Sequence, residues 1–256
     1  VTEEIVLGLA WELHRQTGQK RLCLAGGVAL NSVANRRIIQ ETPFEELYIQ
    51  PSAGDGGGAL GAAMVAWHCA LGNQDRFIMD HAYWGQAYDT DEIQSALDRA
   101  GANYIHIADT DKLIEVTVNG LTSGEVVGWF HGRFEWGPRA LGHRSILADP
   151  RRAEMKDVVN SKIKFREPFR PFAPSVLVDA SEKYFDLVEP ESAMPARFML
   201  LVVPVHSNRQ EEIPAVNHMG TARIHTVHPD DSPRYSRLIE GFRDLTGMPM
   251  LLNTSF

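Results

Sequence analysis

The stretch RLCLAGGVALNSVANRRIIQ, residues 21–40, decides the fold. An apolar, strand-like run leads into a glycine turn, and a sequence with helical periodicity follows. The same order recurs in ELYIQPSAGDGGGALGAAMVAWHCALG, residues 46–72. A repeated order of strand, glycine turn and helix is typical of α/β proteins, and we predict that residues 1–79 form such a unit.

On either side of this stretch the pattern changes. Residues 2–17 have helical periodicity that ends at Gly18, with Thr2 as a candidate N-cap. The periodicity fails around residues 73–84, which places a domain boundary near residue 80. Residues 80–256 are predicted to be a second α/β domain around a mixed sheet. Its expected helices are one capped by Asp89 or Thr90 with an apolar stripe, and Lys112–Ser123; its expected strands are GEVVGWFHG, PSVLV, FMLLVVPV and MPMLLN.

Composition narrows the class of protein. The chain has 256 residues, 44% of them hydrophobic and 23% charged, as in ordinary globular proteins. Cys23 and Cys69 stand in apolar surroundings and are expected to be reduced, buried residues of a cytoplasmic protein. There is no apolar run long enough for a membrane span and no signal-peptide pattern at the start. Because the chain begins in a helix and stops after an apolar run, we expect a piece of a longer polypeptide.

The charge is unevenly distributed. The net charge is -8, yet residues 131–170 contain ten Lys or Arg and five Asp or Glu. Glycines and prolines separate these cations in WGPRALGHRS and KFREPFRPFAP, which favours fixed turns and extended paths over a uniformly charged helix face. A solvated basic face is the alternative. Such a segment in an acidic chain fits a small phosphate-bearing ligand better than nucleic acid, and it predicts a shaped anion site.

The glycine turns are a second candidate site. Glycines at the end of a strand let backbone amides approach a phosphate, and the N-terminus of the following helix adds positive potential. The alternative is tight packing of strand against helix. Asp55 lies within the second turn, where a carboxylate serves either to cap the next helix or to bind a cation.

Two further groups carry polar side chains. In NHMGTARIHTVH the residues His218, His225 and His228 surround Arg223; a structural role for the histidines is favoured over metal binding because no HExxH or CxxC motif accompanies them. In LLNTSF polar residues follow an apolar strand, where they would line a ligand crevice or form a plain turn.

Taken together, LAGGVALNSVANRRI, PSAGDGGGALGAA, WGPRALGHRSILADPR, KFREPFRPFAP, HMGTARIHTV and LLNTSF resemble the carboxyl-terminal half of the NodU-type O-carbamoyltransferases, which act on nodulation factors and antibiotics. The resemblance covers nearly the whole chain. It implies that residues 1–79 are the last portion of an ASKHA (actin/sugar-kinase-like) domain. It implies that residues 80–256 are a YrdC-like α/β domain, the carbamoyltransferase C-terminal domain.

The family's activity follows as an expectation. The YrdC-like domain would use ATP, as its Mg complex, and carbamoyl phosphate to make carbamoyladenylate, and the ASKHA domain would transfer the carbamoyl group to a hydroxyl of a small-molecule acceptor. The resemblance places ATP and the carbamoyl group at Arg139, Lys164, Arg170, Arg223, Asn253 and Ser255, with Arg144, Lys162 and Arg166 as neighbours. It places a nucleotide at Gly26, Gly27 and Asn31, and Fe or another divalent metal at Asp55.

The chain also departs from the family pattern. The HxxxH motif that supplies two further metal ligands is absent, and so is the amino-terminal half. We therefore expect that this chain does not complete carbamoyl transfer by itself, although it retains the residues for ATP binding. The resemblance is compatible with a homodimer.

Two alternatives stay open at this point. One is related chemistry, either threonylcarbamoyl-adenylate formation for tRNA or carbamoylation during hydrogenase maturation. The other is a non-catalytic module whose basic loop binds an acidic partner protein or RNA, with strong salt dependence and no competition from ATP.

Overall fold

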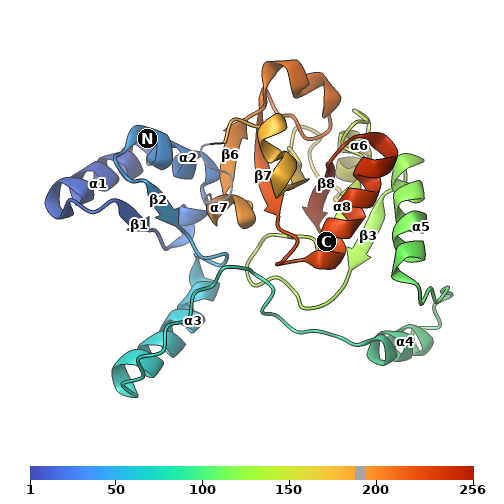
Figure 1. The fold of residues 1–256 in the computed structure, drawn as a ribbon, viewed down its shortest axis with the longest axis horizontal. Helices are drawn as coiled ribbons and strands as arrows, with labels where there is room; N and C mark the ends of the chain where they lie inside the picture. The colour runs from blue at the N-terminus through green and yellow to red at the C-terminus, as the bar shows by residue number, and fades with distance from the viewer. Residues whose placement is uncertain (188–193) are drawn as a thin grey trace.

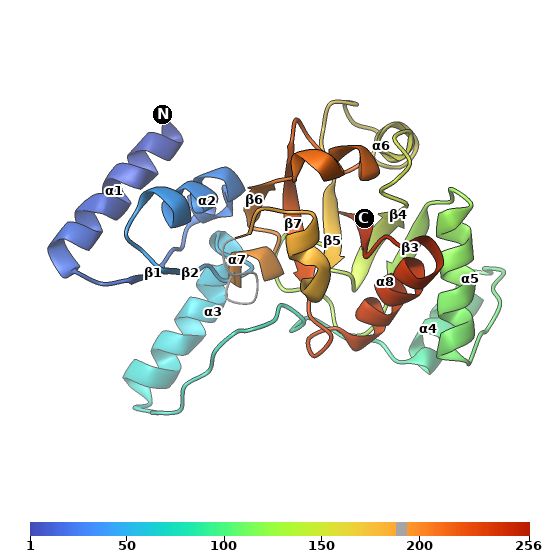
Figure 2. The same cartoon turned by 45° about the horizontal axis from the view of Figure 1, so that its top comes forward.

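The computed structural model describes residues 1–187 and 194–256. Its first part is built on a two-stranded parallel sheet of β1 (Arg21–Cys23) and β2 (Glu46–Tyr48). Helix α1 (Thr2–Thr17) precedes β1, α2 (Ser32–Glu41) joins the strands, and α3 (Asp55–Val65) leaves β2 and projects from the body, as Figures 1 and 2 show. The predicted order of strand, turn and helix is confirmed twice.

The second part is a mixed six-stranded sheet in the order β3–β4–β8–β5–β7–β6. The strands are β3 (Val127–Phe130), β4 (Arg144–Ala148), β5 (Ala173–Leu177), β6 (Leu201–Pro204), β7 (Thr221–Val227) and β8 (Met250–Ser255). Only β5 and β7 run parallel; the other neighbours are antiparallel. The predicted mixed sheet is confirmed.

The helices of this part are α4 (Thr90–Arg99), α5 (Thr110–Thr122), α6 (Met155–Val158), α7 (Met194–Arg197) and α8 (Pro233–Thr246). All but α4 contribute buried side chains to the core against the sheet. Helices α5 and α8 lie side by side, and α8 packs on β5 and β8 (Figures 1 and 2). Asp89 caps α4 in a reciprocal pair of hydrogen bonds with Glu92, as predicted. The expected apolar stripe of α4 buries none of its residues.

The two parts share apolar packing. One core lies between the six-stranded sheet and its helices. The other surrounds β1 and β2 and includes Leu141, Phe198 and Leu200 from the second part of the chain. The buried side chain of Asn35 on α2 donates a hydrogen bond to the carbonyl oxygen of Leu200 at 2.9 Å, which joins α2 to the segment before β6.

Several local predictions near the start of the chain are wrong. Thr2 is the first residue of α1, after Val1, and caps nothing through its side chain. Cys23 is exposed because Leu22 takes the inward position of β1 and alternation turns its neighbour to the open face. Cys69 is exposed because it follows the projecting α3, which buries none of its residues.

Other differences concern regular structure. The predicted helix after the glycine turn is split at Asn31 into the 3₁₀ helix Gly27–Leu30 and α2. The polar residues of LLNTSF do not follow a strand; they belong to β8. Strands β4 and β7 and helix α8 were not predicted, because glycines, prolines and charges mask their apolar pattern. None of the helices in residues 1–187 and 194–256 is long and apolar enough to cross a membrane.

Candidate functional site: an arginine-lined anion site

The two glycine turns lie side by side. The parallel pairing of β1 and β2 brings their carboxyl ends to one edge, and the backbone N–H of Gly26 donates to the carbonyl of Ala53 at 2.8 Å. Gly26 has φ 99°, which favours glycine, and a Cβ on Gly54 would lie 3.8 Å from the Cα of Gly27. Packing of one turn on the other is therefore observed, and phosphate contact there stays a prediction.

Asn31 and Asp55 behave differently from each other. The side chain of Asn31 caps α2 by accepting from the backbone N–H groups of Val33 and Ala34, both at 3.2 Å. Asp55 is exposed at the first position of α3 and makes no capping hydrogen bond, so the capping alternative is not observed. Among the described residues, no three His, Cys, Asp or Glu side chains gather into a metal-binding group. Metal binding at Asp55 stays a prediction.

The loop that carries Arg139 is wrapped around a buried carboxylate. One oxygen of Glu135 accepts backbone hydrogen bonds from Leu141 at 2.7 Å, His143 at 2.9 Å and Arg144 at 3.2 Å. Gly137 has φ 112°, and an added Cβ there would lie 2.4 Å from the carbonyl oxygen of Pro51, so the loop also packs tightly on the turn after β2. These contacts fix the position of Arg139. The sequence predicts no such role for Glu135.

Four of the predicted cations line two adjoining cavities. The larger has a volume of about 530 Å³ and the smaller about 120 Å³. Both are lined by Arg139, Arg166, Phe172 and Arg223. Asn31 and Arg170 line only the larger cavity, whereas Asn253 and Ser255 line only the smaller. A volume of several hundred Å³ is usual for a small-molecule site.

The three shared arginines raise the positive potential of these cavities. Burial, followed by the nearby charges of Arg139 and Arg166, lowers the pKa of Arg223 to about 10. Burial also lowers the pKa of Arg139. Among the described residues, none of the three forms an ion pair with a carboxylate, and the Nε atoms of Arg139 and Arg223 are buried without a hydrogen-bond partner. Clustered cations of this kind are stabilised by a bound anion.

Ser255 in β8 lines the smaller cavity, and Lys164 contacts Ser255 but lines neither cavity. The Lys164 ammonium donates to the carbonyl oxygen of Ser255 and lies 3.4 Å from its hydroxyl. Burial, and then the charge of Arg166, lowers the pKa of Lys164. Arg166 itself donates to the side-chain oxygen of Asn160 at 2.7 Å and lies over the ring of Phe172. The turn that carries Lys164 and Arg166 is consequently held by side-chain contacts as well as by its prolines.

Other predicted site residues lie at the edge of the site or outside it. Arg170 is exposed and paired with Glu167 at 3.1 Å. Lys162 is exposed on a short π-helical turn, Val159–Ile163, and lines neither cavity. Arg144 lines neither cavity either: its guanidinium lies over the ring of Phe134 and 3.9 Å from Glu135. The expected extended path from Lys164 to Arg170 is instead a turn, with Phe165 at φ 47°.

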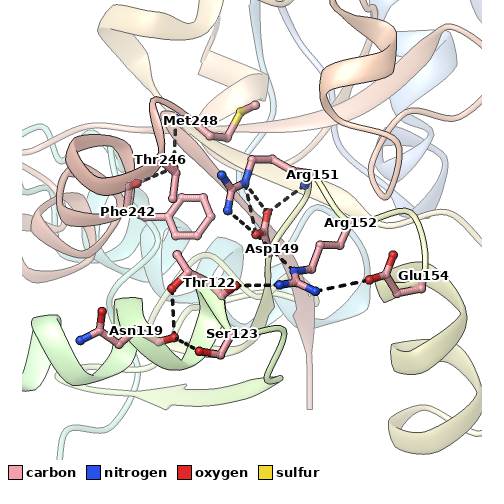
Figure 3. A network of polar contacts seen from close by, with 10 residues as sticks. All are labelled: Asn119, Thr122, Ser123, Asp149, Arg151, Arg152, Glu154, Phe242, Thr246 and Met248. Atoms are coloured by element: carbon pink, nitrogen blue, oxygen red, sulfur yellow. Dashed lines mark hydrogen bonds and ion pairs between the residues drawn. The ribbon is translucent and has the colours of Figure 1, made fainter.

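Two cations of the basic segment have a structural role (Figure 3). The buried carboxylate of Asp149 accepts from the Nη2 of Arg151 at 2.6 Å and lies 3.8 Å from the Nε of Arg152. Arg152 also donates to the carbonyl oxygen of Thr122 at the end of α5, at 2.9 Å, and Arg151 lies over the ring of Phe242 on α8. This network ties the end of β4 to both helices.

Of the histidines near Arg223, one is a buried structural residue and another lines a cavity. His225 is buried and its Nδ1 lies 2.8 Å from the Ser175 hydroxyl, which supports the structural role favoured from sequence. His218 lines the larger cavity. Ser175 had no signal in the sequence, because only the pairing of β5 with β7 brings it opposite His225.

The structure is that of an α/β protein with two adjoining cavities that share three arginines. Comparison with known sequences gives the family: residues 118–256 match the family described as "Carbamoyltransferase C-terminus", and residues 1–64 match "Carbamoyltransferase N-terminus". The chain belongs to the carbamoyltransferase family, related to the NodU proteins, which confirms the resemblance drawn from the sequence.

Curated relatives align with the whole chain. An uncharacterized protein of Synechocystis is 43% identical over 279 residues, covering 100% of this chain and 45% of the relative. Nodulation protein NolNO of Sinorhizobium fredii is 41% identical, covering 99% of this chain and 37% of the relative. Nodulation protein U of Rhizobium tropici is 32% identical, covering 97% and 40%. The chain thus spans less than half the length of these relatives.

Proposed function

We propose that this chain holds the adenylation site of an ATP-dependent O-carbamoyltransferase. In this proposal residues 80–256 are a YrdC-like domain that forms carbamoyladenylate from carbamoyl phosphate and ATP, and residues 1–79 are the last portion of an ASKHA domain. The carbamoyl group then passes to a hydroxyl of a small-molecule acceptor, as part of a longer polypeptide. The observation that carries the proposal is the convergence of Arg139, Arg166 and Arg223 on two adjoining cavities.

The chemistry needs this arrangement. Water takes the phosphoryl group of carbamoyl phosphate as inorganic phosphate, a carbamate oxygen bonds to the α-phosphorus of ATP, and the bond to pyrophosphate breaks. Negative charge develops on the α-phosphoryl oxygens and on the leaving pyrophosphate, so the barrier falls when fixed cations already surround them. Arginines that are half-buried and unpaired before the substrates bind meet this need without reorganisation.

The two cavity sizes support the binding of a different substrate in each cavity. The larger cavity, with Asn31 and Arg170 at its border, has a volume suited to a nucleotide. The smaller one, with Asn253 and Ser255 at its border, would take the acyl phosphate. The shared arginines would then lie between the two substrates, where the new bond forms.

A calorimetric titration of the purified chain tests the proposal. Mg-ATP is added with and without carbamoyl phosphate, to the unaltered chain and to Arg223→Ala. The control is Arg243→Ala, which removes a partly exposed arginine of α8 that pairs with Asp244 and lines neither cavity. We expect binding that weakens at least about tenfold in Arg223→Ala and is unchanged in the control. Folded chain that binds neither ligand, or Arg223→Ala that binds as well as the control, would overturn the proposal.

A further inference from the structure

The loop that carries Arg139 lies against the segment that joins α3 to α4. Residues 82–86 of that segment, here named the joining segment, run beside the start of the loop. A Cβ added to Gly85 would lie 2.7 Å from the Cβ of Phe134, so the two backbones are in close contact. Backbone hydrogen bonds connect them, from the N–H of Trp136 to the carbonyl oxygen of Ala82 at 2.6 Å, from Gly85 to Phe134 at 2.9 Å and from Phe134 to Gln86 at 3.0 Å.

Tyr83 holds the same loop on the other side of Arg139. Its side chain is buried, and its hydroxyl donates to the carbonyl oxygen of Leu141 at 2.9 Å. Its ring stacks on the ring of His143, with 3.7 Å between the ring centroids. The loop is therefore held before Arg139 by the backbone of the joining segment and after it by one side chain of that segment.

Arg139 has little else to fix its position. Among the described residues its side chain makes one hydrogen bond, from Nη2 to the carbonyl oxygen of Leu30, and at 3.5 Å this bond is long. Its Nε is buried without a partner. A side chain with so few contacts follows the backbone that carries it. The position of the guanidinium in the two cavities consequently depends on the loop, and the loop depends on what holds it.

We infer that Tyr83 is a positioning residue for Arg139, so that the affinity of the two cavities for phosphate groups depends on the segment that joins the two parts of the chain. The inference rests on the proposed function, since it assigns substrate phosphates to these cavities. A guanidinium that is already in place binds an anion without an ordering cost, whereas a loose loop loses conformational freedom when the anion binds. Tyr83 lines neither cavity, so its loss removes no group that would touch the anion.

Calorimetric titration with inorganic pyrophosphate tests the role of Tyr83. Tyr83→Ala should bind pyrophosphate at least about tenfold more weakly than the unaltered chain, because Arg139 is no longer held in place. Tyr83→Phe keeps the ring on His143 and loses the hydrogen bond to Leu141. It should bind pyrophosphate about threefold more weakly.

A matched pair of glycine variants tests the joining segment with Tyr83 intact. Gly85→Ala adds a Cβ that meets Phe134 and pushes the segment away from the loop. It should weaken pyrophosphate binding at least about threefold. Gly8→Ala adds the same methyl group in open space on α1 and should leave the affinity unchanged. Thermal unfolding shows whether each variant folds, and the glycine pair decides the question if Tyr83→Ala does not.

A double-mutant cycle separates positioning from general damage. If Tyr83 acts through Arg139, Tyr83→Ala should change pyrophosphate affinity by less than about twofold in a chain that already carries Arg139→Ala. In a chain that carries Arg223→Ala and keeps Arg139, the loss should remain about tenfold. A merely structural role would weaken binding by the same factor in both chains, and that result would overturn the inference.

The outcomes distinguish this inference from the proposed function. If pyrophosphate does not bind to the folded, unaltered chain, both are wrong. If it binds, and Tyr83→Ala and Gly85→Ala bind it as tightly as Gly8→Ala does, the inference alone is wrong. If the cycle gives the expected coupling and Mg-ATP does not bind, the positioning role stands and the adenylation site is wrong.

Discussion

The carboxylate of Glu135 accepts a hydrogen bond from the backbone N–H of His143, eight residues later, at 2.9 Å. Leu141 and Arg144 donate to the same oxygen. We predict that Glu135→Leu lowers the free energy of unfolding by about 3 kcal/mol, because several buried N–H groups lose their acceptor. Glu135→Gln keeps an oxygen there and should cost about 1 kcal/mol. Urea unfolding measures both; equal stability of Glu135→Leu and the unaltered chain would contradict the anchoring role.

Arg223 should reduce the stability of the ligand-free chain. Its cation is largely buried beside Arg139 and Arg166, which holds its pKa near 10. That pKa lies above the working range, so the charge persists at neutral pH. Replacing the cation by an apolar side chain of similar length, Arg223→Met, should raise the free energy of unfolding by about 1 kcal/mol.

The same variant should lose the stabilisation that phosphate gives. For the unaltered chain the thermal midpoint should rise with added phosphate, since a ligand that binds only the folded state stabilises it. For Arg223→Met this rise should shrink. Scanning calorimetry at a series of phosphate concentrations measures both effects. The prediction is contradicted if Arg223→Met is less stable than the unaltered chain and its thermal midpoint rises with phosphate as much as before.

Asp149 should matter for stability and not for anion binding. Its carboxylate is fully buried and pairs with Arg151 and Arg152 (Figure 3). None of these three residues lines either cavity. We predict that Asp149→Ala costs about 3 kcal/mol, since it leaves partly buried cations without their partner. Glu12→Ala removes an exposed helix pair with Arg15 and should leave the free energy of unfolding nearly unchanged. Urea unfolding gives the stabilities, and unchanged phosphate affinity of Asp149→Ala confirms the separation from the site.

The chain should lose stability as the pH falls from 6.5 toward 4. Burial, and then the neighbouring charge of His143, lowers the pKa of His131 to about 3, and burial lowers that of His143 to about 4. Their rings lie 4.0 Å apart. Unfolded chains take up protons at these histidines below about pH 6.5, whereas the folded chain does not. Stability is therefore intact above pH 6.5 and declines below it, by about 1.4 kcal/mol per pH unit for each histidine.

A variant assigns this effect to the buried pair. His143→Gln should make the decline in unfolding free energy between pH 6.5 and 5 shallower, and His106→Gln, which replaces an exposed histidine, should leave it as it is. Urea titrations at several pH values measure the slope. The same slope in both variants would show that His143 does not bear the linkage.

Sequence patterns predicted the features that depend on residues close together in the chain. The repeated strand, glycine turn and helix of residues 21–72, the cap at Asp89 and the strand ending in the basic loop follow from local periodicity and backbone preference. The basic segment also predicted a site, because arginines between glycines and prolines have few conformations. The ion pairs of Arg151 and Arg152 with Asp149 were not predicted. Asp149 belongs to the same basic segment, and the net charge of that segment does not show which of its arginines pair with a buried acid.

By itself the sequence determined the α/β class, the family and the four arginines that line the cavities. The tertiary structure decided which of them meet, since Arg139, Arg166 and Arg223 come from a loop, a turn and a strand that only the mixed sheet brings together. It also decided the orientation of Asn253, which depends on Ala140 and Ser175, 113 and 78 residues away in the chain. Hydrogen bonds act over about 3 Å, so partners this distant in sequence become neighbours only when the strands pair.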